Sequence, residues 1–485
     1  MPIDAIYLPD PRFPSLGEAF FDPVAAARFP ARQLRFRNQA WAARVGLGGL
    51  SDDDWSRHFW AFEPLPGNLE RPLALRYHGH QFQVYNPQLG DGRGFLFAQL
   101  RDPVDQRLLD LGTKGSGQTP WSRGGDGRLT LKGGVREILA TEMLEALGVY
   151  TSKTFSLFET GEALERGDEP SPTRSSVMVR LSHGHVRFGS FQRQAYLRDT
   201  ARLGMLLEFA ASHYLPEVSA AGANELAPAF LRAVSERAAR LAASWMVAGF
   251  VHGVLNTDNL NITGESFDYG PWRFLPRYDP AFTAAYFDSM GLYAYGRQPA
   301  VVLWNLEQLA VALAPLATVE RLEEALSTYE VVFRTEYRRR FRERLGVDSR
   351  GDEADTSLVR AALGFLGESY VGFDRFFFDW YGGAASAARA LGGSAARHYT
   401  GPRYEEFRAL LDRHAPSHPE RLAGEYFRRD QPCSMLIQEV ESLWDAIAER
   451  DDWGPLEAKI AEVRAMGAAL GHPVAGGDAR VESRA

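Results

Sequence analysis

Cysteine and lysine are both scarce in this chain. Cys433 is the one cysteine in 485 residues, which excludes an intrachain disulfide framework and fits a reducing compartment. Only four of the 54 Lys and Arg residues are Lys. No apolar run reaches the roughly 18 residues that a membrane-spanning helix needs, and the first residues lack the basic and apolar regions of a leader peptide. We therefore expect a cytoplasmic protein without a membrane partner.

Composition limits the function further. Hydrophobic residues make up 45% of the chain, enough for a full globular core. A chain of 485 residues is longer than a single core usually grows, which predicts two lobes or domains. The net charge of −8 argues against a general affinity for nucleic acid, which needs a positive surface. We expect no nucleic-acid partner.

The pattern along the chain predicts an α+β fold, because strand signals give way to helical ones. Short apolar runs at 95–100, 107–111 and 176–181 predict strands. A stripe at helical spacing predicts a helix that ends at Gly148, and a second predicts one that ends at Gly249. Further helical patterns cover 299–313, 318–345, 355–366, 384–391, 404–413, 435–449 and 455–468.

These patterns divide the chain into four parts. Residues 1–70 read as an irregular extension that packs on the rest, and 71–195 as a strand-rich lobe with one key helix. Residues 196–470 form a helical lobe with a helical extension at its end, and 471–485 a disordered tail. A cleft between the two lobes is then the expected ligand site.

Lys114 stands in a glycine-rich run, G-T-K-G-S-G. In a chain that otherwise uses Arg, a retained Lys suggests a point charge against phosphate. Two further glycine-rich segments, Q-L-G-D-G-R-G at 88–94 and R-G-G-D-G-R at 123–128, could let backbone N–H groups approach phosphate closely. Neither matches a Walker A loop or a dinucleotide fingerprint, so ordinary turns remain an alternative.

Glu137 follows on the first predicted helix and could supply the carboxylate that a buried Lys114 needs. A solvated acid near a helix start is the alternative. Farther along, Asp258 and Asn259 interrupt an apolar stretch, and Asp268 lies ten residues beyond Asp258. Asn259 and Asp268 offer hard oxygen ligands for Mg²⁺ or Mn²⁺, which leaves Asp258 as a general base. Asx-turns would explain the same residues.

Two arginines extend this set. Arg180 ends a predicted strand, and Arg187 follows in H-G-H-V-R-F-G. Both could clamp phosphate oxygens, although fifty arginines make a surface role the simpler expectation. The pairs His78/His80 and His183/His185 have the spacing of metal ligands on one strand face.

These motifs, in this order and at these spacings, resemble the selenoprotein O (YdiU) family from about Tyr77 to about Leu306, with little resemblance beyond about residue 345. The resemblance implies a two-lobed, protein-kinase-like fold. It also implies an enzyme that binds ATP in a reversed orientation and transfers AMP to Ser, Thr or Tyr hydroxyls of proteins, releasing pyrophosphate. UMP transfer from UTP is attributed to bacterial members, and self-modification is left open.

Site residues carry over from the family motif by motif. In this sequence the resemblance implies that Asp258 is the base, that Glu137 pairs with Lys114, and that Asn259 and Asp268 hold Mg²⁺ or Mn²⁺. The residues implied to contact nucleotide are Gly90, Gly92, Arg93, Lys114, Asp126, Gly127, Arg180, Arg187 and Asp268.

The chain departs from the family pattern at its C-terminus. Many members end in a short Cys or selenocysteine tail, whereas this chain ends E-S-R-A with no cysteine after Cys433. The sequence therefore offers no support for redox control through such a tail, and leaves the question of redox regulation open. Two other functions fit the same residues: a kinase-type phosphotransferase, and a nucleotide-binding scaffold without turnover.

Overall fold

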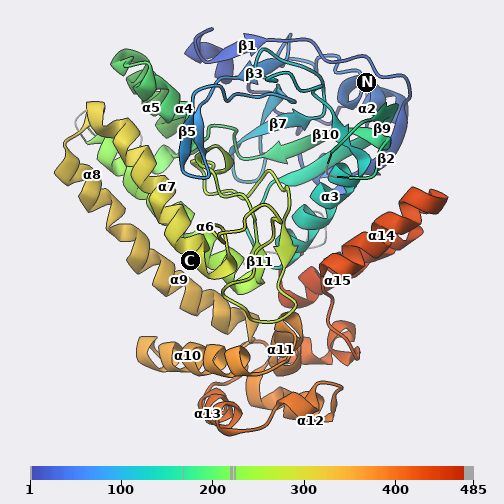
Figure 1. The fold of residues 1–485 in the computed structure, drawn as a ribbon, viewed down its shortest axis with the longest axis vertical. Helices are drawn as coiled ribbons and strands as arrows, with labels where there is room; N and C mark the ends of the chain where they lie inside the picture. The colour runs from blue at the N-terminus through green and yellow to red at the C-terminus, as the bar shows by residue number, and fades with distance from the viewer. Residues whose placement is uncertain (1–2, 168, 219–221, 223–224, 474–485) are drawn as a thin grey trace.

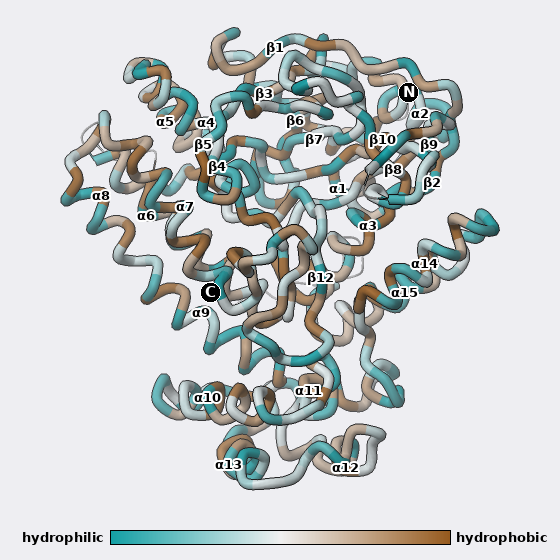
Figure 2. Tube along the Cα trace, viewed as in Figure 1, coloured by the Kyte–Doolittle hydropathy of each residue, from teal (hydrophilic) through white to brown (hydrophobic). Residues whose placement is uncertain are grey.

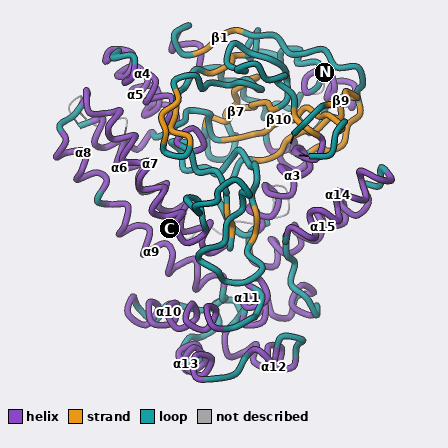
Figure 3. The backbone as a smooth tube through the Cα atoms, viewed as in Figure 1, coloured by secondary structure: helices purple, strands orange, loops and turns teal. Residues whose placement is uncertain are grey.

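The computed structural model describes residues 3–167, 169–218, 222 and 225–473 (Figure 1). Strands gather in one half of the molecule and helices in the other (Figure 3). The first half is built on a mostly antiparallel sheet and the C-terminal part is helical. The α+β class expected from the sequence is confirmed at this level.

An eight-stranded sheet forms the centre of the first half. Its order is β1-β3-β6-β7-β10-β9-β2, with β8 paired to β10, and each of these pairings is antiparallel. The strands predicted at 95–100, 107–111 and 176–181 are confirmed as β6, β7 and β10. The strands are β1 (Phe21–Pro23), β2 (Gln33–Arg37), β3 (Leu73–Leu75), β6 (Leu96–Arg101), β7 (Leu108–Lys114), β8 (Leu129–Thr130), β9 (Lys153–Leu164) and β10 (Thr173–Ser182).

The segment 1–70 is not irregular throughout, so that expectation was wrong. It supplies β1 and β2, the strands at the two ends of the sheet order, and two helices, α1 (Gln39–Arg44) and α2 (Asp52–Phe59). Trp55 of α2 is buried against Phe155 of β9, with ring centroids 5.1 Å apart. These elements are too short to show a hydrophobic period of their own. Pairing with the sheet and burial against it specify them instead.

The helix predicted to end at Gly148 is α3 (Leu131–Ala146). Thr130 caps its start by accepting a hydrogen bond from Gly133 N–H, and Gly148 follows its end with φ 72°. The helix packs on β9 and β10 of the sheet and on α15. Its buried face includes Glu137, which places a carboxylate in the interior of the first half.

The C-terminal part confirms most of the predicted helices. The helix ending at Gly249 is α6, and Gly249 adopts the left-handed conformation. The pattern at 318–345 forms two helices, α8 and α9, that meet at Ser327. Helices α4, α5 and α11 have no counterpart among the helical patterns predicted from the sequence. The helices are α4 (Phe188–Tyr196), α5 (Thr200–Tyr214), α6 (Leu226–Ala248), α7 (Gln298–Leu313), α8 (Val319–Leu326), α9 (Thr328–Arg344), α10 (Asp352–Glu368), α11 (Phe373–Trp380), α12 (Ala387–Gly392), α13 (Pro402–Leu411), α14 (Ile437–Arg450) and α15 (Gly454–Leu470).

Two short hairpins join the halves. Strands β4 (Gly79–Gln81) and β5 (Val84–Asn86) pair beside α4, and β11 (Phe250–Val251) pairs with β12 (Arg273–Phe274) after α6. The loop between β11 and β12 carries Asp258, Asn259 and Asp268. Asp258 and Asp268, ten residues apart, therefore lie within one long hairpin loop.

One helical stretch is more apolar than the sequence reading allowed. Tyr295–Leu316 spans 22 residues and is apolar enough, by length and composition alone, to cross a membrane. Its Val302, Leu306 and Leu309 are buried in the core, and α7 packs on α4 and α6. A helix buried in a protein core has the same length and apolar composition, so this stretch is weak evidence for a membrane span. Helix α9 differs, because it is hydrophilic along most of its length (Figure 2).

The expected disordered tail, 471–485, falls mostly on 474–485, which lie outside the described residues. Gly471 closes α15 in the left-handed conformation, with φ 88°, and His472 N–H donates to Gly467 O at 2.7 Å. Cys433 is buried.

Candidate active site

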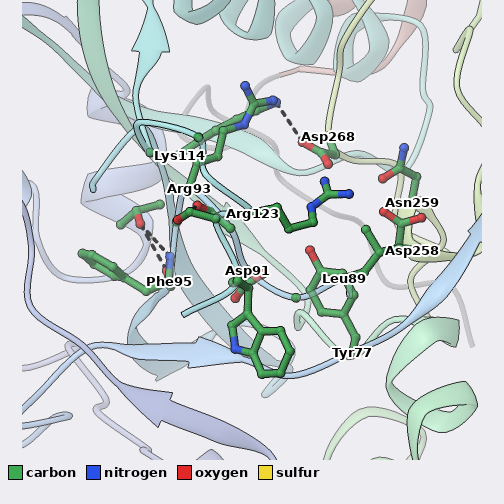
Figure 4. Close-up of a pocket in the computed structure, with 18 of the residues that line it drawn as sticks. Tyr77, Leu89, Asp91, Arg93, Phe95, Lys114, Arg123, Asp258, Asn259 and Asp268 are labelled. Carbon is green, nitrogen blue, oxygen red and sulfur yellow. Dashed lines mark hydrogen bonds and ion pairs between the residues drawn. The ribbon is translucent and has the colours of Figure 1, made fainter. Parts of the chain in front are cut away.

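A cavity of about 650 Å³ is lined both by the sheet half and by the β11–β12 loop. Eleven of the twelve predicted site residues line it, and the twelfth, Glu137, bonds to Lys114. Figure 4 shows Asp258, Asn259 and Asp268 gathered on one side of the cavity, with the Arg123 side chain extending toward them. Predicted residues up to 178 positions apart in the sequence, Gly90 and Asp268, thus share one site.

Lys114 is the centre of a buried charge cluster. It is the last residue of β7, and its Nζ donates to Glu137 Oε1 at 2.5 Å and to Asp268 Oδ1 at 2.8 Å. The side chains of Lys114 and Glu137 are only 7% and 2% exposed. A solvated role for Glu137 is therefore excluded. The cluster joins the sheet, α3 and the β11–β12 loop through a single ammonium group.

Asp268 occupies an unusual backbone position. Its φ is 63°, a left-handed conformation that few residues other than Gly adopt and that costs energy unless the surroundings hold it. Burial raises the pKa of Asp268, but the charges of Lys114, Arg180 and Arg187 outweigh that effect and hold the pKa well below its usual range. The carboxylate is therefore kept ionised and fixed in direction, as a metal ligand must be.

Arg180 and Arg187 face the same carboxylate. Arg180 on β10 is opposite Gly112 on β7, so it lies on the same sheet face as Lys114, and its Nη1 is 3.7 Å from Asp268 Oδ1. Arg187, at the start of α4, donates from Nη1 to the backbone O of Asp258 at 2.8 Å. Both guanidinium groups are buried, and within the described residues Arg180 Nη1 and Arg187 Nε make no hydrogen bond. These N–H groups are available to an anion in the cavity.

Asp258 and Asn259 belong to a short 3-10 turn, Thr257–Asn259. Burial raises the pKa of Asp258 to about 6, although Arg187 opposes the shift. Its Oδ1 is buried and has no hydrogen-bond partner in the part of the chain described. Asn259 donates from Nδ2 to Val254 O at 3.0 Å, and no donor among the described residues bonds to its Oδ1. Asp258 thus has the pKa of a usable general base.

The glycines of the predicted phosphate loops pack closely against neighbouring segments of the chain. A Cβ on Gly90 would lie 2.4 Å from Trp121 Cγ, and one on Gly92 would lie 2.8 Å from Trp121 O. Gly127 has φ 70°, and a Cβ there would lie 2.2 Å from the backbone of Gly117. Loop packing therefore accounts for these glycines, and contact with phosphate stays a prediction.

Asp126 lines the cavity, but its carboxylate turns to Arg166, at 2.8 Å. Arg93 and Arg123 also line it, and in the described residues neither side chain forms a hydrogen bond or ion pair. Because cations outnumber acids around this cavity, the site suits a polyanion. The basic residues are Arg93, Lys114, Arg123, Arg128, Arg166, Arg180 and Arg187, against Asp91, Asp126, Asp258 and Asp268.

Several lining residues escaped the sequence reading. Asp91 lies 3.5 Å from Arg187, and Tyr77 places its ring 4.5 Å beneath the same guanidinium. His185, which the sequence offered only as a metal ligand, instead accepts a hydrogen bond from Arg180 Nε at 3.1 Å. Asp91 and Arg123 stand inside the glycine-rich segments, which was the available signal, whereas nothing local marks Tyr77.

The H-x-H pairs serve as hydrogen-bonding residues. His183 contacts Tyr150 at 2.7 Å, whereas His185 contacts Asp110 at 3.2 Å. His78 contacts Tyr85 and His80 contacts Gln192. No group of three or more His, Cys, Asp or Glu side chains in the described ranges is arranged to hold a metal. A metal ion held by two protein ligands plus phosphate needs no such group, and the Oδ1 of Asn259 and the ionised Asp268 fit that kind of site.

Comparison with known proteins identifies the family. The model of the family described as protein adenylyltransferase SelO matches residues 7–464. The chain belongs to the SelO family. Among similar proteins, a protein nucleotidyltransferase YdiU of Synechocystis sp. is 46% identical over 94% of this chain and 97% of its own length. The protein nucleotidyltransferase YdiU of Gloeobacter violaceus is 45% identical over 94% of this chain and 94% of its own length.

Membership of the SelO family makes this chain an enzyme of a protein adenylyltransferase family, whose relatives are named for nucleotidyl transfer. The match to residue 464 also corrects the expectation that resemblance ends near residue 345. The helices beyond that point carry no short motif, so their similarity is visible only across the full length.

Proposed function

We propose that this SelO-family chain transfers AMP from ATP, or UMP from UTP, to Ser, Thr or Tyr hydroxyls of proteins and releases pyrophosphate. One observation carries the proposal: Asp258, Asn259, Asp268 and Lys114 share a cavity in which basic residues outnumber acidic ones. Nucleotidyl transfer leaves pyrophosphate as the departing group, and that group needs more positive charge than a single phosphoryl group does.

The bonds exchanged are simple to state. The acceptor hydroxyl oxygen forms a bond to the α-phosphorus, and the bond from that phosphorus to the oxygen bridging the β-phosphorus breaks. The hydroxyl proton passes to Asp258, whose pKa of about 6 leaves it ionised and ready near neutral pH. Pyrophosphate departs with the electron pair of the broken bond.

The remaining residues position the nucleotide. Lys114, oriented by Glu137 at 2.5 Å, would meet the β- and γ-phosphates together with Arg93, Arg180 and Arg187. In this orientation of the nucleotide, the β- and γ-phosphates lie against the sheet half and the α-phosphate lies toward Asp258. This is the reverse of the arrangement in a kinase. Asp126 and Gly127 would contact the nucleotide from the 123–128 loop.

Asn259 and Asp268 would hold Mg²⁺ or Mn²⁺. The metal, when bound, supplies positive charge to the phosphate oxygens. Asp268 Oδ1 already accepts from Lys114 at 2.8 Å, so a metal and Lys114 would share this carboxylate. The ionised state of Asp268 supports the assignment, because a protonated acid is a poor ligand for either ion.

A two-lobed, protein-kinase-like architecture is part of the same proposal, with 71–195 as the small lobe and 196–470 as the helical lobe. The antiparallel sheet, the buried Lys114–Glu137 pair on β7 and α3, and the cavity shared with the β11–β12 loop support it. We also propose a cytoplasmic location and an action independent of nucleic acid and membrane, on the charge and cysteine content noted above.

A labelling experiment tests the reaction. Purified protein is incubated with Mg²⁺ or Mn²⁺, a cell lysate as acceptor, and ATP labelled on either the α- or the γ-phosphate, with Asp268→Asn as the blank. Label retained on protein from the α-position alone is the expected result. Label from the γ-position alone would identify a phosphotransferase, and label from neither would identify a nucleotide-binding scaffold.

A further inference from the structure

Three exposed aromatic side chains stand together beside the cavity: Phe82, Tyr286 and Phe287, here called the aromatic rim. The ring centroids of Phe82 and Phe287 are 5.9 Å apart, and those of Tyr286 and Phe287 are 5.1 Å apart. Their exposed fractions are 37%, 81% and 48%. Met290, on the same segment as Tyr286, is 83% exposed. Grouped large apolar side chains on a surface mark an interaction site.

The aromatic rim is tied directly to the catalytic loop. Phe82 is at the tip of the β4–β5 hairpin, next to Gln81, which lines the cavity. Phe82 N–H donates to Asn256 Oδ1 at 3.1 Å, and the Tyr293 hydroxyl donates to the same oxygen at 2.7 Å. Asn256 lines the cavity two residues before Asp258. Both segments that carry the rim therefore meet at the start of the catalytic turn.

The segment 279–297 holds its part of the rim rigidly, although it contains no strand and only one short 3-10 turn at its end. Asp288 is buried, and its two carboxylate oxygens accept from the N–H groups of Leu292 and Tyr293, each at 2.8 Å. Tyr295 N–H donates to Phe282 O at 2.9 Å. A preformed apolar surface binds a partner without first having to order itself.

We propose that the aromatic rim docks the target protein, as an extended segment whose acceptor hydroxyl reaches Asp258 while a bulky apolar side chain beside it packs on Phe287 and Tyr286. The inference rests on the proposed function, which requires a second substrate to approach Asp258 from outside the nucleotide cavity. Asp288, the charged residue next to Phe287, is turned inward and satisfied, so the rim offers contact to apolar rather than charged residues. Flanking apolar residues are thus the substrate feature that this enzyme selects.

The test uses a degenerate peptide library with one central Ser, Thr or Tyr, α-labelled ATP and the full chain. Labelled peptides are expected to be enriched in Phe, Leu, Ile or Met near the acceptor. For a single enriched peptide, Phe287→Ser is expected to lower kcat/KM by about tenfold or more. Phe287→Leu keeps an apolar side chain and is expected to lose less.

A matched control is Val331→Ser, which removes an apolar side chain that is 68% exposed on α9, outside the rim. It is expected to label the peptide like the parent. ATP affinity and thermal unfolding of each variant verify that the nucleotide site and the fold are intact. Loss of activity in Phe287→Ser with unchanged ATP affinity supports docking at the rim.

Other outcomes overturn the inference separately from the proposed function. Labelled peptides without apolar enrichment, or a Phe287→Ser variant that labels like the parent, would remove the rim from substrate selection. So would α-label on lysate proteins but on no peptide, because an extended segment would then be insufficient. An absence of α-label on every acceptor would remove the proposed function itself.

Discussion

Lys114 Nζ and Asp268 Oδ1 lie 2.8 Å apart although 154 residues separate them in the sequence. This contact joins the end of β7 to the loop between β11 and β12. Glu137 holds the same ammonium group from α3. The position of one lysine therefore depends on three elements, and a change in any of them alters the charge that faces the cavity.

Asp268→Asn is expected to lower transfer by at least about 100-fold, since metal binding supplies several kcal/mol of charge stabilisation. Asn tolerates the φ of 63° better than Ala does, so the fold is expected to persist. Asp53→Asn, at a side chain that is 84% exposed, is the control. Initial rates of α-label transfer and thermal unfolding provide the measurement. Full activity in Asp268→Asn would exclude this residue as a metal ligand.

Glu137→Gln is expected to weaken ATP binding, because Lys114 loses its buried charge partner. The free energy of unfolding should fall by about 1–3 kcal/mol, less than for an isolated buried charge, since Lys114 keeps Asp268. Glu142→Gln is a matched control: Glu142 is buried on the same helix and pairs with Arg464 at 2.6 Å, away from the cavity. Calorimetric ATP titration compares the two variants. Equal ATP affinities would contradict the assigned role of Glu137.

Gly112→Ala is expected to disturb the site by displacing His185, which lines the cavity. A Cβ there would lie 2.3 Å from His185 Nε2, the atom that accepts from Arg180. We expect ATP affinity to fall together with a loss of about 1–3 kcal/mol of stability, as for overpacked cores. Gly204→Ala is the control, because a Cβ there has open space and helical Ala stabilises. A Gly112→Ala variant with parental stability and affinity would show that His185 can move freely.

Glu265 should make stability depend on pH. Burial raises its pKa from 4.5 to about 7, so the native state keeps a proton that the unfolded chain has lost. The stabilisation is complete below about pH 4.5 and is lost as pH rises through about 7. Glu265→Gln removes this loss, so the variant should gain stability relative to the parent over that interval, by up to about 1.4 kcal/mol per pH unit.

Urea unfolding of parent and Glu265→Gln at several pH values measures the effect. The neutral amide can still accept the His183 N–H, which Glu265 Oε2 accepts at 2.7 Å. Exposed Glu208→Gln controls for the substitution itself. If the free energy of unfolding changed with pH in the same way for the parent and for Glu265→Gln, the raised pKa of Glu265 would be contradicted.

Much of the fold was predictable because its elements carry their own signals. Strands β6, β7 and β10 are short apolar runs, and α3 and α6 have apolar stripes that end at Gly148 and Gly249. The missed elements lack such signals. Strand β2 is half-buried along its length without alternation, and α2 is only eight residues long. Contacts with the sheet specify both, and a local pattern does not contain those contacts.

The sequence by itself determined the chemical types in the site: Lys114, Glu137, Asp258, Asn259 and Asp268, in an order that fits nucleotide chemistry. Only the tertiary structure decided which neighbours surround them, such as Asp91, Tyr77 and the aromatic rim. It also showed that Gly90 and Gly92 pack against Trp121. The physical reason is that charge and hydrogen-bonding capacity belong to each side chain, whereas burial, pKa and direction arise from groups brought together across the whole chain.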